Sequence, residues 1–266
     1  MGMLGWLRIT LRGSGIIALL ILLVPLHYLY RLLRYGSPFP MLFLAGTARL
    51  VGARVHRHGV PLRRDVFFLA NHISWVDVLA LGGASGTAFV AKAEVRDSPV
   101  LGWLAGLNRT VFVSRENRIG VAEQINALRE SLADNWSIAV FPEGTTTDGQ
   151  SLLPFKTSML RVLEPPPPGV MVQPVLLDYG AIAEWIGWVG DETGIANAKR
   201  ILARRGSFDL AIHFLDPFDP RDFSGRKTIA AEARARIEPA LVTALGKPLR
   251  VFGHDVGPVG YVAAAE

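Results

Sequence analysis

The chain has 266 residues, half of them hydrophobic, with 28 basic and 23 acidic side chains and no cysteine. This length can bury one sizeable core and still leave an apolar surplus, which favours one folded domain with a membrane anchor. The lack of cysteine excludes disulfides and zinc–thiolate sites, and it fits a domain that faces the cytosol. Residues 1–64 contain nine arginines and no acid. Nucleic-acid binding is disfavoured, because no basic stretch interleaved with aromatic residues accompanies this charge.

The basic N-terminal region carries two apolar segments. Residues 14–30 are strongly apolar but fall a little short of the ~20 residues needed to cross a hydrocarbon core upright. Residues 41–51 are apolar again, with only Arg49 charged. A single span stays open, but the pattern favours a helical hairpin that dips into one leaflet. We predict a membrane-anchoring two-helix region over residues 1–56, retained because no small-residue cleavage site follows it.

From Asp65 onwards, strand-like and helix-like segments alternate. Short apolar runs predict strands over 66–70, 87–91, 111–113, 137–141, 170–177 and 208–214. Residue spacing predicts helices over 76–81, 100–107, 119–132, 157–163 and 228–245. This alternation predicts one α/β domain over residues 57–266.

Two polar boxes stand where strand-like runs end, namely Asn71-His72-Ile73-Ser74-Trp75-Val76-Asp77 and Phe141-Pro142-Glu143-Gly144-Thr145. A histidine can form a hydrogen bond with a carboxylate five positions later in the sequence when a strand-to-helix turn separates them. Asp77 would then hold one ring nitrogen of His72 while the other faces a substrate hydroxyl. Because open α/β sheets bind ligands beyond the carboxyl ends of their strands, we expect His72 and Glu143 to face one cleft.

The His-x4-Asp box followed by a Phe-Pro-Glu-Gly box resembles the glycerolipid acyltransferase family, specifically the bacterial 1-acylglycerol-3-phosphate acyltransferases. Four boxes match in order: 72–77, 111–115, 141–145 and 172–175. The resemblance covers residues 65–178 and implies a mixed, mostly parallel sheet flanked by helices, with a two-helix membrane motif before it. The second box departs from the family's pattern, with Asn108 and Ser114 where a glycine and an acid are usual.

The resemblance implies an O-acyltransferase that moves a fatty acyl chain from a thioester to the sn-2 hydroxyl of 1-acylglycerol-3-phosphate, giving phosphatidic acid. His72 would take the hydroxyl proton, and Asp77 would fix the tautomer and stabilise the imidazolium. Backbone N–H groups at Gly144-Thr145 or beside His72 would stabilise the oxyanion. The donor would be acyl-CoA or acyl carrier protein as a co-substrate, and neither a cofactor nor a metal is expected.

The acceptor would be held by charged side chains. Arg115, with Lys92 as a second choice, would bind an acceptor phosphate through charge-assisted hydrogen bonds. Glu143 would position the acceptor's hydroxyls. Arg115 also begins the charged run Arg115-Glu116-Asn117-Arg118, which is typical of a solvated surface.

Other functions explain the same residues. A lyso-ornithine lipid O-acyltransferase has an acceptor without phosphate, so replacement of Arg115 would leave its activity largely intact. A non-catalytic membrane lipid-binding protein would tolerate loss of His72. A serine hydrolase is disfavoured, because the sequence lacks a Gly-x-Ser-x-Gly elbow.

Composition and surface charge suggest a location and a partner. The chain has 23 arginines against 5 lysines, which hints at a GC-rich bacterial source. We therefore expect the cytoplasmic face of a bacterial inner membrane. A surface that includes Arg200, Arg204 and Arg205 could meet an acidic carrier protein, although an exposed basic helix face explains it as well.

Overall fold

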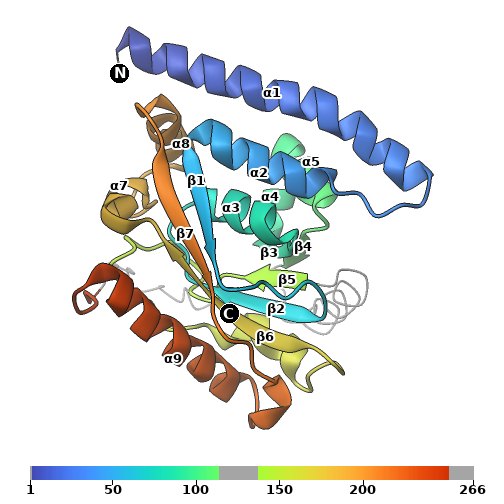
Figure 1. The fold of residues 1–266 in the computed structure, drawn as a ribbon, viewed down its shortest axis with the longest axis vertical. Helices are drawn as coiled ribbons and strands as arrows, with labels where there is room; N and C mark the ends of the chain where they lie inside the picture. Colours follow the sequence, from blue (N-terminus) through green and yellow to red (C-terminus); the bar gives the residue numbers. More distant parts are fainter. Residues whose placement is uncertain (1, 114–136, 252–266) are drawn as a thin grey trace, which may run out of the picture.

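The computed structural model describes residues 2–113 and 137–251, and a seven-stranded sheet lies at its centre (Figure 1). The strands are β1 (Ala53–His58), β2 (Val66–Ala70), β3 (Ala88–Lys92), β4 (Val111–Val113), β5 (Ser137–Val140), β6 (Met171–Asp178) and β7 (Phe208–Phe214). Their order across the sheet is β1-β7-β6-β2-β5-β3-β4. Neighbouring strands are parallel except β6 and β7. The predicted mixed, mostly parallel sheet is confirmed.

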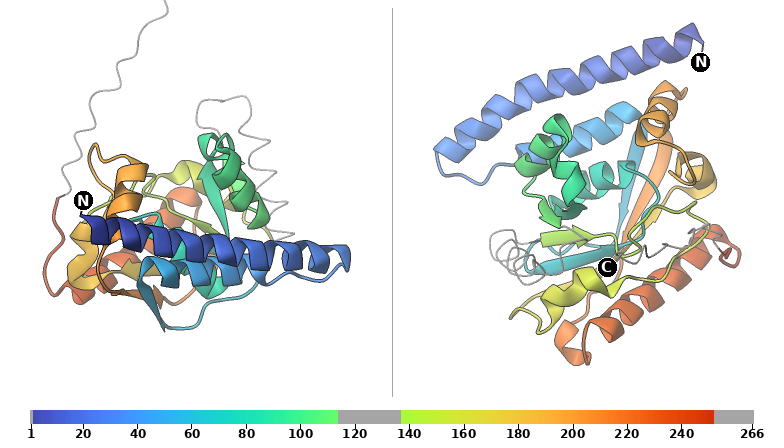
Figure 2. Two further views of the ribbon diagram at one scale, coloured as in Figure 1. Left: turned by 90° about the horizontal axis from the view of Figure 1, so that it is seen from above. Right: turned by 180° about the vertical axis from the view of Figure 1, so that it is seen from behind.

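Helices cover both faces of this sheet (Figures 1 and 2). The α-helices are α1 (Met3–Leu32), α2 (Phe39–Val51), α3 (Val76–Ser85), α4 (Ala93–Arg96), α5 (Pro99–Leu107), α7 (Ala183–Ile186), α8 (Gly194–Ala203) and α9 (Arg226–Leu245). Short 3-10 helices are η1 (Thr157–Leu163), η2 (Gly180–Ile182) and η3 (Pro220–Asp222). The helices α1, α2, α3 and α5 lie on one side of the sheet, and α9 lies on the other.

The central strand β2 shows why the sheet is buried on both faces. All five of its residues are buried, as parallel sheets covered by helices require. Phe68 packs in the cluster that includes Ala48 and Val51 of α2. Phe67 packs in the opposite cluster, with Ile229 of α9. Two cores therefore fix the register of β2, and with it the position of the residue that follows, Asn71.

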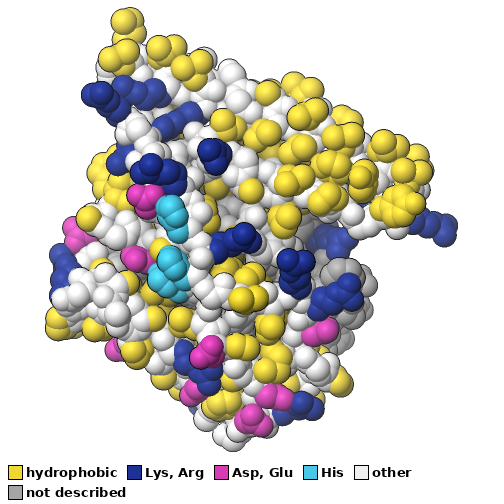
Figure 3. Space-filling view, viewed as in Figure 1, with side chains coloured by type: hydrophobic (Ala, Val, Ile, Leu, Met, Phe, Trp, Pro, Cys, Tyr) yellow, Lys and Arg dark blue, Asp and Glu magenta, His cyan; other side chains and the backbone are white. Residues whose placement is uncertain are grey.

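The N-terminal helix α1 lies along the outside of the molecule with its hydrophobic side chains exposed (Figure 3). It has 30 residues and is, by length and composition, able to cross a membrane. Arg8 and Arg12 tie it to the end of α8, where their guanidinium groups donate to backbone carbonyls of Ala203, Ile201, Leu202 and Gly206. Cations are favourable at a helix C-terminus. An apolar anchor helix is thus fixed to the folded domain.

The helix α2 joins this anchor to the sheet by packing closely on α3. A Cβ atom at Gly83 would lie 2.6 Å from the backbone of Ala45, so only glycine permits this approach. The predicted boundary between residues 56 and 57 falls inside β1, because β1 pairs with β7 from Ala53 onwards. The N-terminal helices and the α/β domain are therefore joined without a linker.

Several predicted elements differ from the structure. The strand β1 was not predicted, because its sequence Ala-Arg-Val-His-Arg-His lacks an apolar run; it lies at the sheet edge with mostly exposed side chains. The helix predicted over residues 157–163 is present with those bounds, as a 3-10 helix. The helix predicted over 119–132 lies outside the described residues.

Candidate active site

The two polar boxes meet beside the centre of the sheet. Strands β2 and β5 are parallel neighbours, with Leu69 opposite Val140, so their carboxyl ends lie at the same edge. The turn that begins at Phe141 therefore lies beside His72. Glu143 Oε1 accepts a hydrogen bond from the backbone N–H of His72 at 2.8 Å. The structure thus brings His72 and Glu143 together, as the strand-end argument expects.

His72 and Asp77 form a hydrogen-bonded pair across the turn into α3. His72 Nδ1 lies 2.8 Å from Asp77 Oδ2, and Asp77 is fully buried. The same oxygen accepts the backbone N–H groups of Ile73 at 2.6 Å and Ser74 at 2.8 Å. The other carboxylate oxygen, Oδ1, accepts the hydroxyl of Tyr179 at 2.6 Å. Four donors therefore hold this carboxylate, and its demand for a donor places the hydrogen of His72 on Nδ1.

The backbone and ring of His72 are fixed from the other side by the loop that begins with the Phe-Pro-Glu-Gly box. The N–H of His72 is held by Glu143, and its carbonyl accepts the N–H of Thr147 at 2.8 Å. The imidazole stacks on the ring of Phe141, with 4.1 Å between centroids and 14° between planes. The His72 side chain is 20% exposed. Because Nδ1 is bound to Asp77, Nε2 is the nitrogen left for a substrate.

Tyr179 is a site residue that the sequence analysis missed. Its hydroxyl is buried against Asp77, and burial together with that carboxylate raises the pKa of Tyr179 well above its ordinary value. The hydroxyl therefore stays protonated and donates. The signal was available in the sequence, because Tyr179 directly follows β6, which neighbours β2 in the sheet. The strand-end rule applied to His72 and Glu143 also selects Tyr179.

Glu143 was predicted to position the acceptor's hydroxyls, but in this structure both of its carboxylate oxygens accept backbone N–H groups of the chain itself. Its side chain is fully buried, and its second oxygen accepts the backbone N–H of Leu153 at 2.8 Å. Burial raises the pKa of Glu143 to about 8, while the hydrogen bonds from Leu153 and His72 act in the opposite direction. Its contacts are those of a side chain that holds two loops, at His72 and Leu153.

The raised pKa of Glu143 predicts a pH dependence of stability. Between the ordinary pKa of a glutamate and about pH 8, the folded state binds a proton that the unfolded state has released. The free energy of unfolding should therefore fall as pH rises from about 5 to about 8, by up to about 1.4 kcal/mol for each pH unit. Urea unfolding in detergent micelles should show this slope, and Glu143→Gln should lack it. Equal slopes for both proteins would mean that Glu143 is ionised when folded.

Most of the backbone N–H groups that were predicted to stabilise the oxyanion already donate hydrogen bonds within the chain. The N–H of Gly144 donates to the carbonyl of Phe141 in the turn, where Gly144 has a φ of 71°. The N–H groups of His72, Ile73 and Ser74 are also taken. Among the residues that the structure describes, the Thr145 N–H donates no hydrogen bond. The Thr145 N–H is thus still able to donate to an oxyanion, and its predicted role stays a prediction.

The two predicted phosphate ligands are not placed by the structure. Arg115 lies outside the described residues. Lys92 ends β3, which runs parallel to β5, so its backbone lies toward the same edge of the sheet as His72. The side chain of Lys92 also lies outside the described part. Both roles stay predictions.

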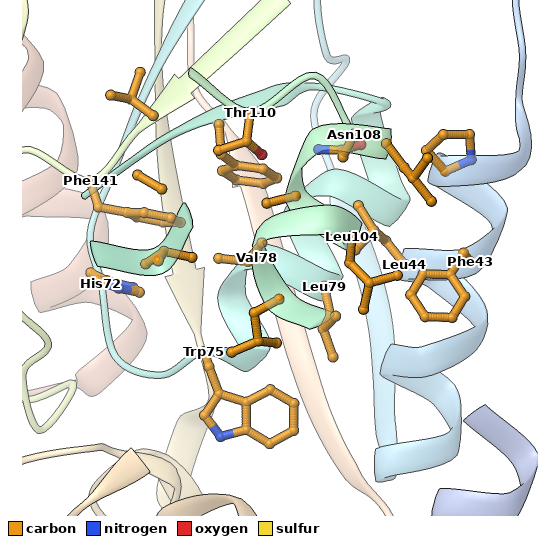
Figure 4. Close-up of a pocket in the computed structure, with 18 of the residues that line it drawn as sticks. Phe43, Leu44, His72, Trp75, Val78, Leu79, Leu104, Asn108, Thr110 and Phe141 are labelled. Atoms are coloured by element: carbon orange, nitrogen blue, oxygen red, sulfur yellow. The ribbon is translucent and has the colours of Figure 1, made fainter. Parts of the chain in front are cut away.

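A largely apolar pocket of about 800 Å³ opens beside His72 (Figure 4). In the close-up, His72 and Phe141 lie at one end, Phe43 and Leu44 of α2 lie at the other, and Val78, Leu79 and Leu104 lie between them. Leu20, Leu23 and Val24 of α1 also line it. The pocket therefore runs from the His72 ring to the apolar N-terminal helices, a shape and chemistry suited to a lipid tail.

The wall near His72 is held by a polar network that no motif revealed. The indole N–H of Trp75 donates to Asn197 Oδ1 at 2.9 Å, and Asn197 Nδ2 donates to Glu192 at 2.7 Å. Arg200 forms an ion pair with the same Glu192 at 2.7 Å. Arg200, predicted as part of a carrier-binding surface, is therefore engaged within its own chain, whereas Arg205 is exposed.

Comparisons with known proteins agree with this geometry. An acyltransferase family model matches residues 52–178. The lyso-ornithine lipid O-acyltransferase of Brucella abortus is 33% identical over 264 residues, covering 91% of this chain and 97% of that protein. The 1-acyl-sn-glycerol-3-phosphate acyltransferase of Neisseria gonorrhoeae is 33% identical over 111 residues, covering 42% of this chain and 44% of that protein.

A solved structure shares the fold. The crystal structure of the 1-acyl-sn-glycerophosphate (LPA) acyltransferase PlsC from Thermotoga maritima superposes with a TM-score of 0.66 at 22% identity, covering 89% of this chain and 95% of that one. The family match contains His72, Asp77 and Glu143. The Brucella relative extends the similarity to nearly the whole chain. The chain belongs to the acyltransferase family that includes these lipid acyltransferases.

Proposed function

We propose that this protein transfers a fatty acyl chain from a thioester donor to a hydroxyl of lyso-ornithine lipid. The observation that carries the reaction is the His72–Asp77 pair, whose free Nε2 lies at the end of a large apolar pocket. The choice of acceptor rests on the relatives, because four lyso-ornithine lipid O-acyltransferases are 31–36% identical over 73–91% of this chain. The sequence motifs alone favoured 1-acylglycerol-3-phosphate.

The proposed chemistry uses His72 as a general base. Nε2 takes the proton of the acceptor hydroxyl as its oxygen attacks the thioester carbonyl carbon. The carbonyl oxygen becomes an oxyanion, for which the Thr145 N–H is the proposed donor. Collapse breaks the carbon–sulfur bond, and the imidazolium returns the proton to the thiolate. The products are an ester and a free thiol, and the buried Asp77 carboxylate stabilises the imidazolium between the two steps.

Glu143 and Tyr179 support this pair as positioning residues in the proposed mechanism. Glu143 holds the backbone N–H of His72, and Tyr179 fixes the carboxylate oxygen of Asp77 that His72 does not use. Neither side chain needs to touch a substrate. This arrangement supports a preorganised base, because the imidazole is held in place before the acceptor arrives.

The second candidate acceptor is 1-acylglycerol-3-phosphate. It is favoured by the Neisseria relative, whose name states that acceptor and which is 33% identical over 111 residues. The two candidates differ in the expected role of Arg115, which should matter more for the phosphate acceptor than for lyso-ornithine lipid, since the latter has no phosphate. For either acceptor the proposed place of reaction is the cytoplasmic face of a bacterial membrane, where acyl-CoA and acyl carrier protein are soluble.

The test is an acyl-transfer assay on purified protein in lipid or detergent. Lyso-ornithine lipid and 1-acylglycerol-3-phosphate are offered separately with acyl-CoA and with acyl carrier protein, and His72→Ala is the blank. We expect His72-dependent formation of ornithine lipid. Phosphatidic acid as the main product would instead establish the second candidate. Absence of His72-dependent transfer in all four combinations would reject acyl transfer to these lipids.

A further inference from the structure

The helix α5 exposes an unusual amount of apolar surface. Residues 99–107 contain no charged side chain, and none of them is buried. Val100 and Leu101 are each 60% exposed, and Trp103 is 43% exposed. Single exposed apolar residues are ordinary, but a run of large ones on one short helix marks a surface that contacts another apolar phase or molecule.

This surface continues that of the N-terminal helices. The indole nitrogen of Trp103 on α5 lies 3.5 Å from the hydroxyl of Tyr28 on α1. Tyr28 is itself exposed, as are the adjacent Leu29 and, one turn further along α1, Leu32. Both views in Figure 2 place α5 beside the C-terminal part of α1, on the same side of the sheet. The exposed side chains of α1 and α5 therefore form one apolar face.

The same helix also forms a wall of the lipid-sized pocket. Leu101 and Leu104 of α5 line the pocket together with Leu20 and Leu23 of α1. Leu101 is thus both exposed at the surface and part of the lining. Because α5 borders the pocket on one side and belongs to the apolar face on another, the pocket lies next to the phase or molecule that this face contacts.

We propose that α5 is a third membrane-contacting helix, which inserts Val100, Leu101 and Trp103 into the lipid bilayer beside α1. The proposal rests on the membrane location proposed above. The bilayer is the occupant because the face continues the exposed surface of an apolar 30-residue helix. Trp103 and Tyr28, which meet where α5 contacts α1, are aromatic side chains with polar tips of the kind enriched at the membrane–water interface.

The chain lacks cysteine, so one introduced thiol can carry a fluorescent probe without background. Val100→Cys labelled with NBD reports on α5, and Val100 does not line the pocket. Leu7→Cys on the exposed face of α1 is the positive control, and the exposed Ala244→Cys on α9 is the matched negative control. Each protein is mixed with vesicles of phosphatidylethanolamine and phosphatidylglycerol, with and without brominated acyl chains.

We expect NBD at positions 100 and 7 to shift to the blue and to be quenched by bromine, whereas NBD at position 244 should not respond. A response at position 7 without one at position 100 would overturn the proposal while leaving the N-terminal anchor intact. No response at either position would overturn both. A blue shift at position 100 without bromine quenching would mean that a second copy of the chain covers α5.

A charge substitution gives an independent measurement. Val100→Glu should weaken vesicle binding about tenfold, because inserting a carboxylate forfeits the free energy of burying an apolar side chain. Ala244→Glu should bind vesicles like the parent protein. Acyl transfer in detergent micelles should be unchanged in both variants, so a loss of vesicle binding is separable from a failure of the proposed activity. Unchanged vesicle binding by Val100→Glu would contradict the insertion of α5.

Discussion

Replacing His72 with alanine should lower the rate of acyl transfer about 10²- to 10⁴-fold, because it removes the proposed base. The fold should survive. The buried Asp77 keeps the N–H groups of Ile73 and Ser74 and the hydroxyl of Tyr179 as donors after the imidazole is lost. The initial rate of thiol release from acyl-CoA with saturating acceptor measures the effect, and near-UV circular dichroism checks the fold.

The matched control is His58→Ala. His58 is an exposed histidine of the edge strand β1 that stacks on His213. The strands β7 and β6 separate β1 from β2, the nearer of the two strands that flank the site. Its loss should leave the rate within about twofold of the parent protein, as expected for a surface change. Added imidazole should restore part of the activity of His72→Ala and should leave that of His58→Ala unchanged. A His72→Ala protein that is folded and retains full activity would exclude His72 as the base.

The strands that carry the site were the most predictable part of the fold. The strand β2 was predicted with its observed bounds, and β4 and β7 likewise. A strand covered on both faces must be apolar throughout, so an uninterrupted run such as Val66–Ala70 stands out in the sequence. The positions of His72 and Glu143 beyond strand ends followed from these bounds and from the order of parallel strands.

Residues whose roles depend on partners distant in sequence were not predictable. Glu143 is an acidic residue within a motif, which suggests contact with a substrate, yet its partners are backbone N–H groups of His72 and Leu153. Asn197 on α8 supports Trp75 from more than a hundred residues away. The edge strand β1 was not predicted, because its backbone pairing with β7 needs no apolar run. Local sequence patterns indicate which residues are buried, but they do not indicate which buried polar atoms form hydrogen bonds with each other.

The second large effect is expected for Asp77→Asn, which separates the charge of Asp77 from its shape. An asparagine at this position can keep Oδ1 on the N–H groups of Ile73 and Ser74, while its amide donates to the hydroxyl of Tyr179. The folded state should therefore lose only about 1 kcal/mol of stability, typical of one rearranged hydrogen bond. Asp77→Ala, by contrast, leaves four donors without their acceptor and should unfold far more readily.

Activity should nevertheless fall about 10²-fold or more in Asp77→Asn, because a neutral amide does not stabilise the imidazolium that forms when His72 takes the acceptor proton. The turnover number should carry the loss, with little change in the KM of the acceptor, since Asp77 is fully buried and has no surface toward the pocket. Tyr179→Phe is the matched control, because it removes one hydrogen bond to Asp77 and keeps the charge. It should lose far less activity than Asp77→Asn. Similar losses in the two variants would mean that orientation, rather than charge, is what Asp77 contributes.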